Sequence, residues 1–227
     1  MDASDLPIRE LDRTAVQETV RLLSLAGPGD LARPTPCDGW TLGSLVAHMT
    51  AQNRGFAAAA RGEGADPAVW RTQRGDDSPA GHRAAAAEVL AAFAGDGIGE
   101  REFALPEFDP VRRFPGRVAI GFHFLDQTVH AWDVARTLGV GFTPSEAAAE
   151  AALRIALRVP DDERRFAEGA FFGPALPAAP GATPFERALA ALGRVPGWTP
   201  ALAVSARGTG GTGGTGSAGG TGGDGGR

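Results

Sequence analysis

The sequence predicts an all-α fold, in which a bundle of four helices is followed by further helices and a disordered glycine-rich tail. Three observations predict it: apolar residues recur at helical spacing, serine or threonine precedes most of these segments, and glycine or proline ends them. The 227 residues are 43% hydrophobic, enough for one sizeable core. We therefore expect one helical domain over residues 1–206 and a tail over 207–227.

The first two helices are expected over residues 8–25 and from Leu42 onward. Thr41 is a good N-cap for the second, because its side-chain oxygen can accept a backbone hydrogen bond at the helix start. Prolines and glycines over residues 28–36 separate the two helices. The expected buried stripe of the second helix comprises Leu42, Leu45, Val46, Met49 and Phe56.

The third and fourth helices are expected over residues 79–93 and 117–138. Ser78 caps the third, and Gly139 ends the fourth in the left-handed conformation that favours glycine. The intervening residues 100–115 are extended and rich in turns, and the pattern gives no firm strand.

Two capping boxes predict a fifth and a sixth helix. Thr143 is followed three residues later by Glu146, and Thr183 by Glu186, so each threonine is expected at the N-cap. Residues 207–227 are nearly all glycine, threonine, serine, alanine and charged residues, which bury too little apolar area to offset the entropy of ordering.

Composition excludes several functional classes. The net charge of -5 argues against a nucleic-acid partner, which calls for a basic surface. No apolar run approaches the length of a membrane span, and residues 1–5 lack the features of a signal peptide, so we expect a cytoplasmic protein. A single cysteine, Cys37, can form neither an internal disulfide nor a cysteine-based zinc site alone.

The fourth helix brings two ionisable side chains to its apolar face. Asp126 and His130 are four residues apart, so both can reach one ion, and a carboxylate buried there needs a cation or a hydrogen-bond donor. If the second and fourth helices are neighbours, His48 closes a triangle with them. Two imidazoles and one carboxylate suit zinc or another first-row metal. The alternative for the Asp126–His130 pair is a simple hydrogen bond.

Several motifs resemble one known family. They are residues 34–41 (PTPCDGWT) leading into 45–48 (LVAH), then 126–135 (DQTVHAWDVA), and finally 172–174 (FGP) with 192–194 (LGR). Together they resemble the metal-binding domain of mycothiol-dependent maleylpyruvate isomerases and the wider DinB-like superfamily of helical bundles. The resemblance implies a DinB-like bundle with His48, Asp126 and His130 as ligands. It also implies a divalent metal, zinc first with nickel, manganese or iron as alternatives, and mycothiol as a co-substrate.

Two departures from that family limit what is carried over. The isomerases typically have glutamate at the position of Asp126, which bears on affinity and metal choice. They also carry a carboxy-terminal domain that contributes to the substrate site, whereas this chain passes into the tail. Maleylpyruvate isomerase activity itself is therefore not carried over.

Most of the other candidate residues have more than one interpretation. His123 is a substitute ligand if the register differs, or else a hydrogen-bond donor behind a ligand or a partly exposed core residue. Asp133 either orients His130 or contacts Arg136 or the backbone. Cys37 is a reactive thiol, a fourth ligand or, as we favour, a packing residue. We expect His82 at the surface. The tryptophans Trp40 and Trp132 are pocket walls or core anchors.

The leading functional hypothesis is a metal-dependent transferase or isomerase in which mycothiol attacks a small electrophile. A metal-dependent hydrolase is the second enzyme hypothesis. A non-catalytic metal-binding or stress-related protein is the alternative outside enzymes, and a homodimer is one expected assembly.

Overall fold

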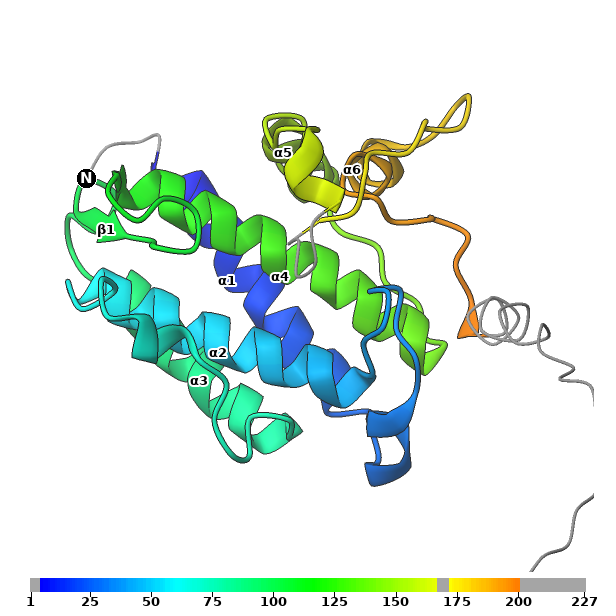
Figure 1. Ribbon diagram of the computed structural model, residues 1–227, viewed down its shortest axis with the longest axis horizontal. Helices are drawn as coiled ribbons and strands as arrows, with labels where there is room; N and C mark the ends of the chain where they lie inside the picture. Colours follow the sequence, from blue (N-terminus) through cyan, green and yellow to red (C-terminus); the bar gives the residue numbers. More distant parts are fainter. Residues whose placement is uncertain (1–4, 167–171, 201–227) are drawn as a thin grey trace, which may run out of the picture.

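The computed structural model describes residues 5–166 and 172–200 and confirms a mostly helical fold (Figure 1). The helices in this part of the chain are α1 (Asp5–Leu23), α2 (Leu42–Ala60), α3 (Pro79–Phe93), α4 (Gly116–Leu138), α5 (Glu146–Ala156) and α6 (Pro184–Ala191). Short 3-10 turns lie at η1 (Pro28–Ala32), η2 (Pro67–Trp70) and η3 (Glu163–Phe166). The predicted tail over 207–227 lies outside the described residues.

The first four helices form the bundle. Helix α1 packs mainly against α4, and α2 mainly against α3, while α2–α4 and α1–α3 contacts close the arrangement. The predicted stripe of α2 is buried from Leu42 to Phe56, because apolar side chains at helical spacing share one face. The contact between α2 and α4 places His48 beside the fourth helix, as the sequence hypothesis required.

Most helix ends follow the local signals in the sequence. Thr41, Ser78 and Thr183 each accept a backbone hydrogen bond at the start of their helices, and Gly139 adopts φ 72° at the end of α4. The expected Thr143 cap is wrong. Ser145, another strong N-cap residue, accepts the bond from the backbone N–H of Ala148 instead, so α5 begins at Glu146.

The region expected to be extended contains a small antiparallel hairpin. Strands β1 (Glu102–Ala104) and β2 (Arg113–Pro115) pair with Phe103 opposite Phe114. Both phenylalanines are buried and join the aromatic core at one end of the bundle, together with Phe56 and Phe93. The hairpin therefore closes the bundle end from which α4 starts.

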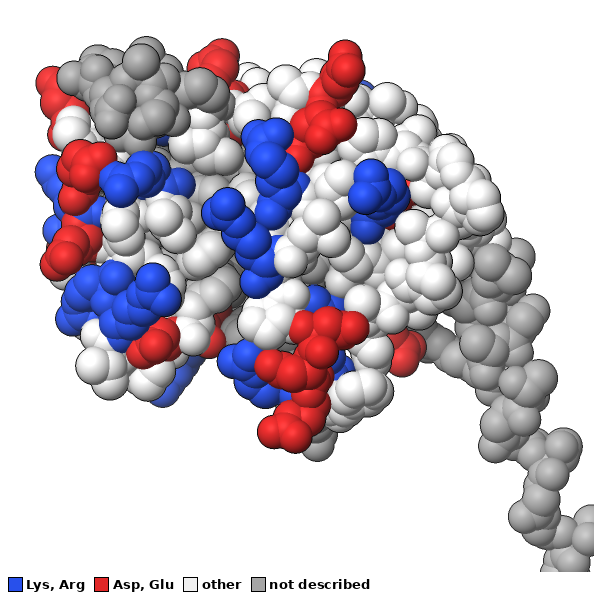
Figure 2. Space-filling model, turned by 90° about the horizontal axis from the view of Figure 1, so that it is seen from above, with Lys and Arg blue, Asp and Glu red and all other residues white. Residues whose placement is uncertain are grey.

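Helices α5 and α6 pack against each other, and α5 also contacts α4 (Figure 1). Their apolar faces share a core cluster with Trp132, so this tryptophan is a core anchor as one reading predicted. On the face seen in Figure 2, arginine and acidic side chains are interspersed rather than gathered by sign. None of the helices described is both long and apolar enough to cross a bilayer.

Candidate metal centre

The three predicted ligands meet between α2 and α4. His48 Nε2 lies 3.6 Å from Asp126 Oδ1, and His130 Nε2 lies 3.3 Å from the same oxygen. The two imidazole rings are 5.2 Å apart between centroids. Two helices thus bring together residues that are 78 positions apart in the chain, between His48 and Asp126.

The spacing of these donor atoms suits a single ion. All three atoms lie within 4.8 Å of one another. Zinc bonds to nitrogen and oxygen are about 2.0–2.2 Å long, which puts neighbouring ligand atoms about 3.4 Å apart around a tetrahedral ion. The observed distances of 3.3 and 3.6 Å match that requirement. The residues therefore fit a divalent metal, and His48 and Asp126, each 21% exposed at the side chain, leave the position open to solvent on one side.

Two histidines lie beside one carboxylate in the candidate centre, and the pKa values of Asp126 and His130 are both shifted. Burial alone would raise the pKa of Asp126, but the adjacent His130 and His48 outweigh it and hold that pKa well below its usual value. Burial likewise opposes a charged His130, yet the carboxylates of Asp126 and Asp133 raise its pKa well above the ordinary value. In the metal-free protein, a proton on His130 therefore neutralises Asp126. Binding of a cation at the same place would displace that proton.

Asp133 orients His130, as one of its two readings predicted. The Nδ1–H of His130 donates to Asp133 Oδ2 at 2.8 Å, which leaves Nε2 directed at Asp126. Metal-binding imidazoles commonly donate their second nitrogen to such an acceptor. The alternative contact with Arg136 is wrong, because Arg136 lies over the Trp132 ring and donates to the Pro196 carbonyl.

The cation next to Asp133 is Arg194, a residue that the sequence did not predict at this site. Arg194 donates through Nη2 to Asp133 Oδ2 at 3.3 Å and to Cys37 Sγ at 3.2 Å. The Cys37 thiol in turn donates to Asp133 Oδ2 at 3.2 Å. Cys37 is therefore more than the packing residue we favoured, and the cationic neighbour comes from a position 157 residues away. The 192–194 motif was the one sequence signal that included Arg194.

Two further contacts shape the surroundings of the ligands. The ring of Trp40 packs edge-on against His48 at 5.1 Å between centroids, and Trp40 is 36% exposed, which supports its reading as a wall of the site. Gln127 donates to Asp126 Oδ2 at 3.3 Å, on the oxygen that does not face the histidines. The other oxygen, Asp126 Oδ1, therefore faces the two histidines.

His123 lies in the core and not among the ligands. Its ring is fully buried, with Nδ1 2.7 Å from Asp12 Oδ1 and Nε2 2.9 Å from Asn53 Oδ1. Both nitrogens are therefore engaged away from the candidate metal centre. The reading of His123 as a substitute ligand is wrong, because α4 has the register that the sequence predicted.

The expected surface position of His82 is also wrong. This side chain has no exposed area, and its Nε2 lies 2.9 Å from Thr19 Oγ1 inside the bundle. Alanines surround it in α3, and alanine fits both buried and exposed positions, so the sequence pattern does not mark the inner face. Burial, with a contribution from nearby His123, lowers the pKa of His82 to about 4.

We expect His82 to make the protein sensitive to mild acid. An unfolded chain takes up this proton near pH 6.5, whereas the folded chain resists it until about pH 4. The free energy of unfolding should therefore fall as the pH falls from 6.5 towards 4, by about 2 to 3 kcal/mol from this group. Urea unfolding at pH 7 and at pH 4.5 measures this change in the free energy of unfolding. His82→Gln should reduce the loss of unfolding free energy between pH 7 and pH 4.5, whereas the exposed control Arg83→Gln should leave that loss unchanged. An equal loss in the parent and both variants would show that His82 is not its cause.

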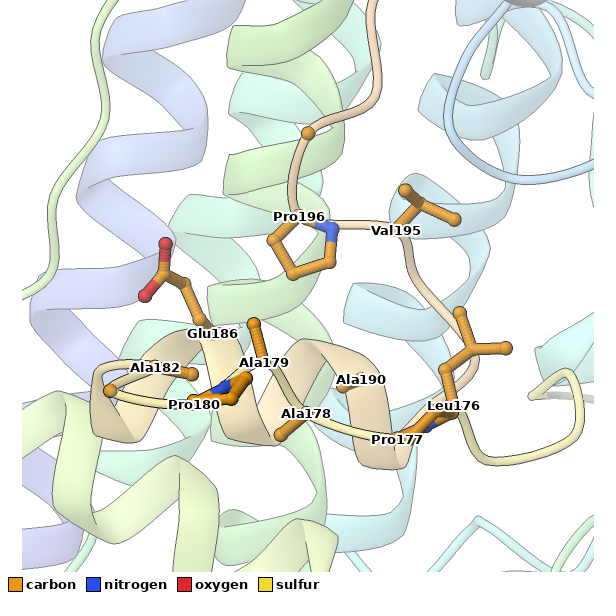
Figure 3. Close-up of a pocket in the computed structure, with 12 residues that line it drawn as sticks. Leu176, Pro177, Ala178, Ala179, Pro180, Ala182, Glu186, Ala190, Val195 and Pro196 are labelled. Atoms are coloured by element: carbon orange, nitrogen blue, oxygen red, sulfur yellow. The ribbon is translucent and has the colours of Figure 1, made fainter.

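A separate hollow lies at α6, away from the candidate ligands. Its volume is about 470 Å³, and it is lined mainly by small and apolar residues of the segment that passes over α6. Figure 3 shows Leu176, Val195 and Pro196 around it, with the Glu186 carboxylate at one side. It contains none of His48, Asp126 or His130. The candidate metal centre is therefore distinct from this hollow.

Comparison with protein families and structures gives consistent matches. The family model of the mycothiol maleylpyruvate isomerase N-terminal domain matches residues 13–135. A crystal structure of a histidine-to-alanine mutant of the mycothiol-dependent maleylpyruvate isomerase aligns with a TM-score of 0.53 at 16% identity. The alignment covers 78% of this chain and 77% of that one. At this identity the likeness shows the fold, and it confirms the predicted DinB-like bundle.

Two curated Mycobacterium tuberculosis proteins, from different strains and both described as uncharacterized, share sequence with the chain. Each is 34% identical over 118 residues, or 52% of this chain. The alignment covers 60% of each relative's length. These relatives support common ancestry over the aligned residues and do not specify an activity.

Proposed function

Because the chain belongs to the mycothiol maleylpyruvate isomerase N-terminal domain family, we propose that it is a thiol-dependent metalloenzyme. The co-substrate is a low-molecular-weight thiol, mycothiol, and the reaction is transfer to, or isomerisation of, a small electrophilic molecule. The metal is divalent and is held by His48, Asp126 and His130. Zinc is the first choice for this set of nitrogen and oxygen donors, with nickel, manganese or iron as alternatives.

The observation that carries this proposal is the convergence of three donor atoms on one point. They come from two helices that contact each other in the bundle, and their separations suit one ion. Three protein ligands with one side open to solvent are typical of catalytic sites, whereas structural zinc sites are usually closed by four protein ligands. The arrangement therefore favours a site that exchanges a small molecule.

A bound divalent ion would supply a positive charge that favours the thiolate form of a thiol near neutral pH. The side chains of this protein do the rest. Asp126 provides the negative charge that holds the cation, and Asp133 fixes the His130 ring so that Nε2 faces the site. Trp40 packs against His48 and limits its rotation at the exposed side. His48, Asp126 and Trp40 are each partly exposed, and this exposed side is where thiol and electrophile would approach each other.

Location and assembly remain predictions from the sequence. We propose a cytoplasmic protein that binds small molecules, and a homodimer as its assembly. The domain division at residue 206 is proposed on the same basis.

The proposed activity is tested by incubating the metal-loaded protein with mycothiol and an activated electrophile such as a chlorodinitrobenzene. We expect consumption of the electrophile to require both thiol and metal, because an ordinary thiol with a pKa of about 8.5 is mostly protonated at pH 7. His130→Ala should reduce the rate to that of the thiol alone. A matched control, Asp96→Asn, removes an exposed carboxylate and should retain full activity. Equal rates with and without protein, over a panel of electrophiles, would reject the thiol-transfer proposal.

A further inference from the structure

We propose that Arg194, in the segment after α6, is a positioning residue for His130 and acts through Asp133. This inference rests on the proposed metal site only for its effect on metal affinity. It assigns to the carboxy-terminal part of the chain a role in the centre, although the matched family region ends at residue 135.

The hydrogen bonds of Asp133 are the first observation that supports this role of Arg194. Its Oδ2 accepts from three donors: His130 Nδ1, the Cys37 thiol and Arg194 Nη2, at 2.8, 3.2 and 3.3 Å. Asp133 has no exposed area, and its Oδ1 has no hydrogen-bond partner. A buried carboxylate bonded on one oxygen needs an opposite charge to stay in place. Arg194, itself only 7% exposed, supplies that charge.

The second support is the way in which the backbone delivers Arg194. Gly193 has φ +77°, and a Cβ at this position would lie 2.8 Å from the Cα of Gly173. Gly193 thus allows its own backbone to touch that of Gly173, which no larger residue at position 193 permits. These two glycines are the centres of the 172–174 and 192–194 motifs. The two motifs therefore meet at the contact between Gly193 and Gly173, next to Arg194, whose side chain reaches Asp133.

Arg165 ties the same two segments together. Its guanidinium donates to the carbonyls of Gly173 and Ala191 at 3.0 and 2.7 Å, and to two carbonyls at residues 159 and 160. Arg165 is buried and bonded almost entirely to backbone, so its role is to brace this part of the chain. The ring of Phe172 lies 5.9 Å from the Arg194 guanidinium and adds a cation–π contact. The approach of Arg194 is therefore constrained on several sides.

The position of Arg194 also bears on whether Cys37 belongs to a second metal site. Cys37, His130 and Asp133 could by spacing hold a metal ion of their own. Arg194 Nη2 already lies within 3.3 Å of both the Cys37 sulfur and the Asp133 oxygen. A guanidinium in that place supplies the positive charge that a second ion would bring. The cluster thus supports the Nδ1 side of His130, and only its Nε2 side faces the proposed metal site.

The consequence for His130 is a fixed ring orientation. A hydrogen bond from Nδ1 to a held carboxylate determines which nitrogen is presented to a metal. Without Arg194, Asp133 would be a buried carboxylate whose remaining donors are Cys37 and His130, and we expect this carboxylate to shift. The His130 ring would then lose its fixed partner.

The role of Arg194 in fixing the His130 ring is tested by measuring proton exchange of the histidine rings in the full-length, metal-free protein. With ¹⁵N-labelled histidine, the Nδ1–H of His130 should exchange slowly in the parent, as should that of buried His123 beside Asp12. Arg194→Gln should accelerate exchange at His130 by about tenfold or more and leave His123 unchanged. Arg194→Lys, which keeps the charge and loses the planar fork, should give an intermediate rate. Arg187→Gln, an exposed arginine of α6, is the matched control.

The His123 proton distinguishes a positioning role from a general loss of stability. Acceleration at His130 alone supports the proposal, whereas equal acceleration at both rings, or none, overturns it. If Arg194→Gln does not fold, the same comparison is made on Arg194→Lys and on Gly193→Ala, which displaces the arginine through the Gly173 contact.

Zinc titration against a chromophoric chelator gives the second readout. Arg194→Gln should bind zinc about 10- to 100-fold more weakly than the parent, as is usual when a residue that supports a ligand is lost. Unchanged affinity in that variant would overturn the proposal. If the parent itself binds no zinc, the metal site fails while the exchange comparison still decides the role of Arg194.

Discussion

His48→Ala and His130→Ala should each lose nearly all of the divalent metal that the parent protein retains after purification without chelator. Each change removes one of three ligand atoms that converge on one point. Loss of a supporting residue alone typically weakens metal binding 10- to 100-fold, so loss of a ligand should weaken it by at least about 100-fold. Elemental analysis by mass spectrometry, expressed as metal per chain, measures the effect.

The variants must be compared at equal folding. Asp96→Asn removes one surface carboxylate and should keep the metal content of the parent, whereas Asp126→Asn should lose it although its shape is nearly unchanged. Circular dichroism confirms that each protein is helical. The metal site would be rejected if the parent carried no metal even after reconstitution with zinc, nickel, manganese and iron.

The parts of the fold that could be predicted depend on local signals. The starts of α2, α3 and α6 follow from Thr41, Ser78 and Thr183, and the end of α4 follows from Gly139, because caps act within one helical turn. The start of α5 was misassigned because Thr143 and Ser145 are both good caps. Sequence alone does not rank two such neighbours. The hairpin escaped prediction because its strands have three residues each, too few to show an alternating pattern.

In the candidate site, too, the residues that could be predicted are those that depend on local helical spacing. Asp126 and His130 share one helix, so helical geometry alone predicts that they meet. His48 needed the further condition that α2 and α4 touch, which the resemblance supplied and the structure meets. The role of Arg194 could not be predicted, because it lies 61 residues from Asp133 and comes from another part of the chain. His82 was misplaced because an alanine-rich helix has no contrast between its faces.

The cobalt-substituted protein should show a sulfur-to-cobalt charge-transfer band when mycothiol is added. The protein offers nitrogen and oxygen at the metal position, from His48, Asp126 and His130, so any sulfur signal must come from the added thiol or from Cys37. Cys37 is engaged with Asp133 and Arg194 on the far side of the His130 ring. The band should therefore be absent before the thiol is added.

Three comparisons make the spectrum specific. Cys37→Ser should retain the thiol-induced band, because this sulfur is not expected to be the ligand. His130→Ala should abolish it together with the metal. S-methyl mycothiol, which has no ionisable sulfur, should leave the spectrum unchanged, since a coordinated thiol is expected to lose its proton. A spectrum that keeps only nitrogen and oxygen character at saturating mycothiol would remove the thiol from the site, and the open position would then belong to water, as in a metal-dependent hydrolase.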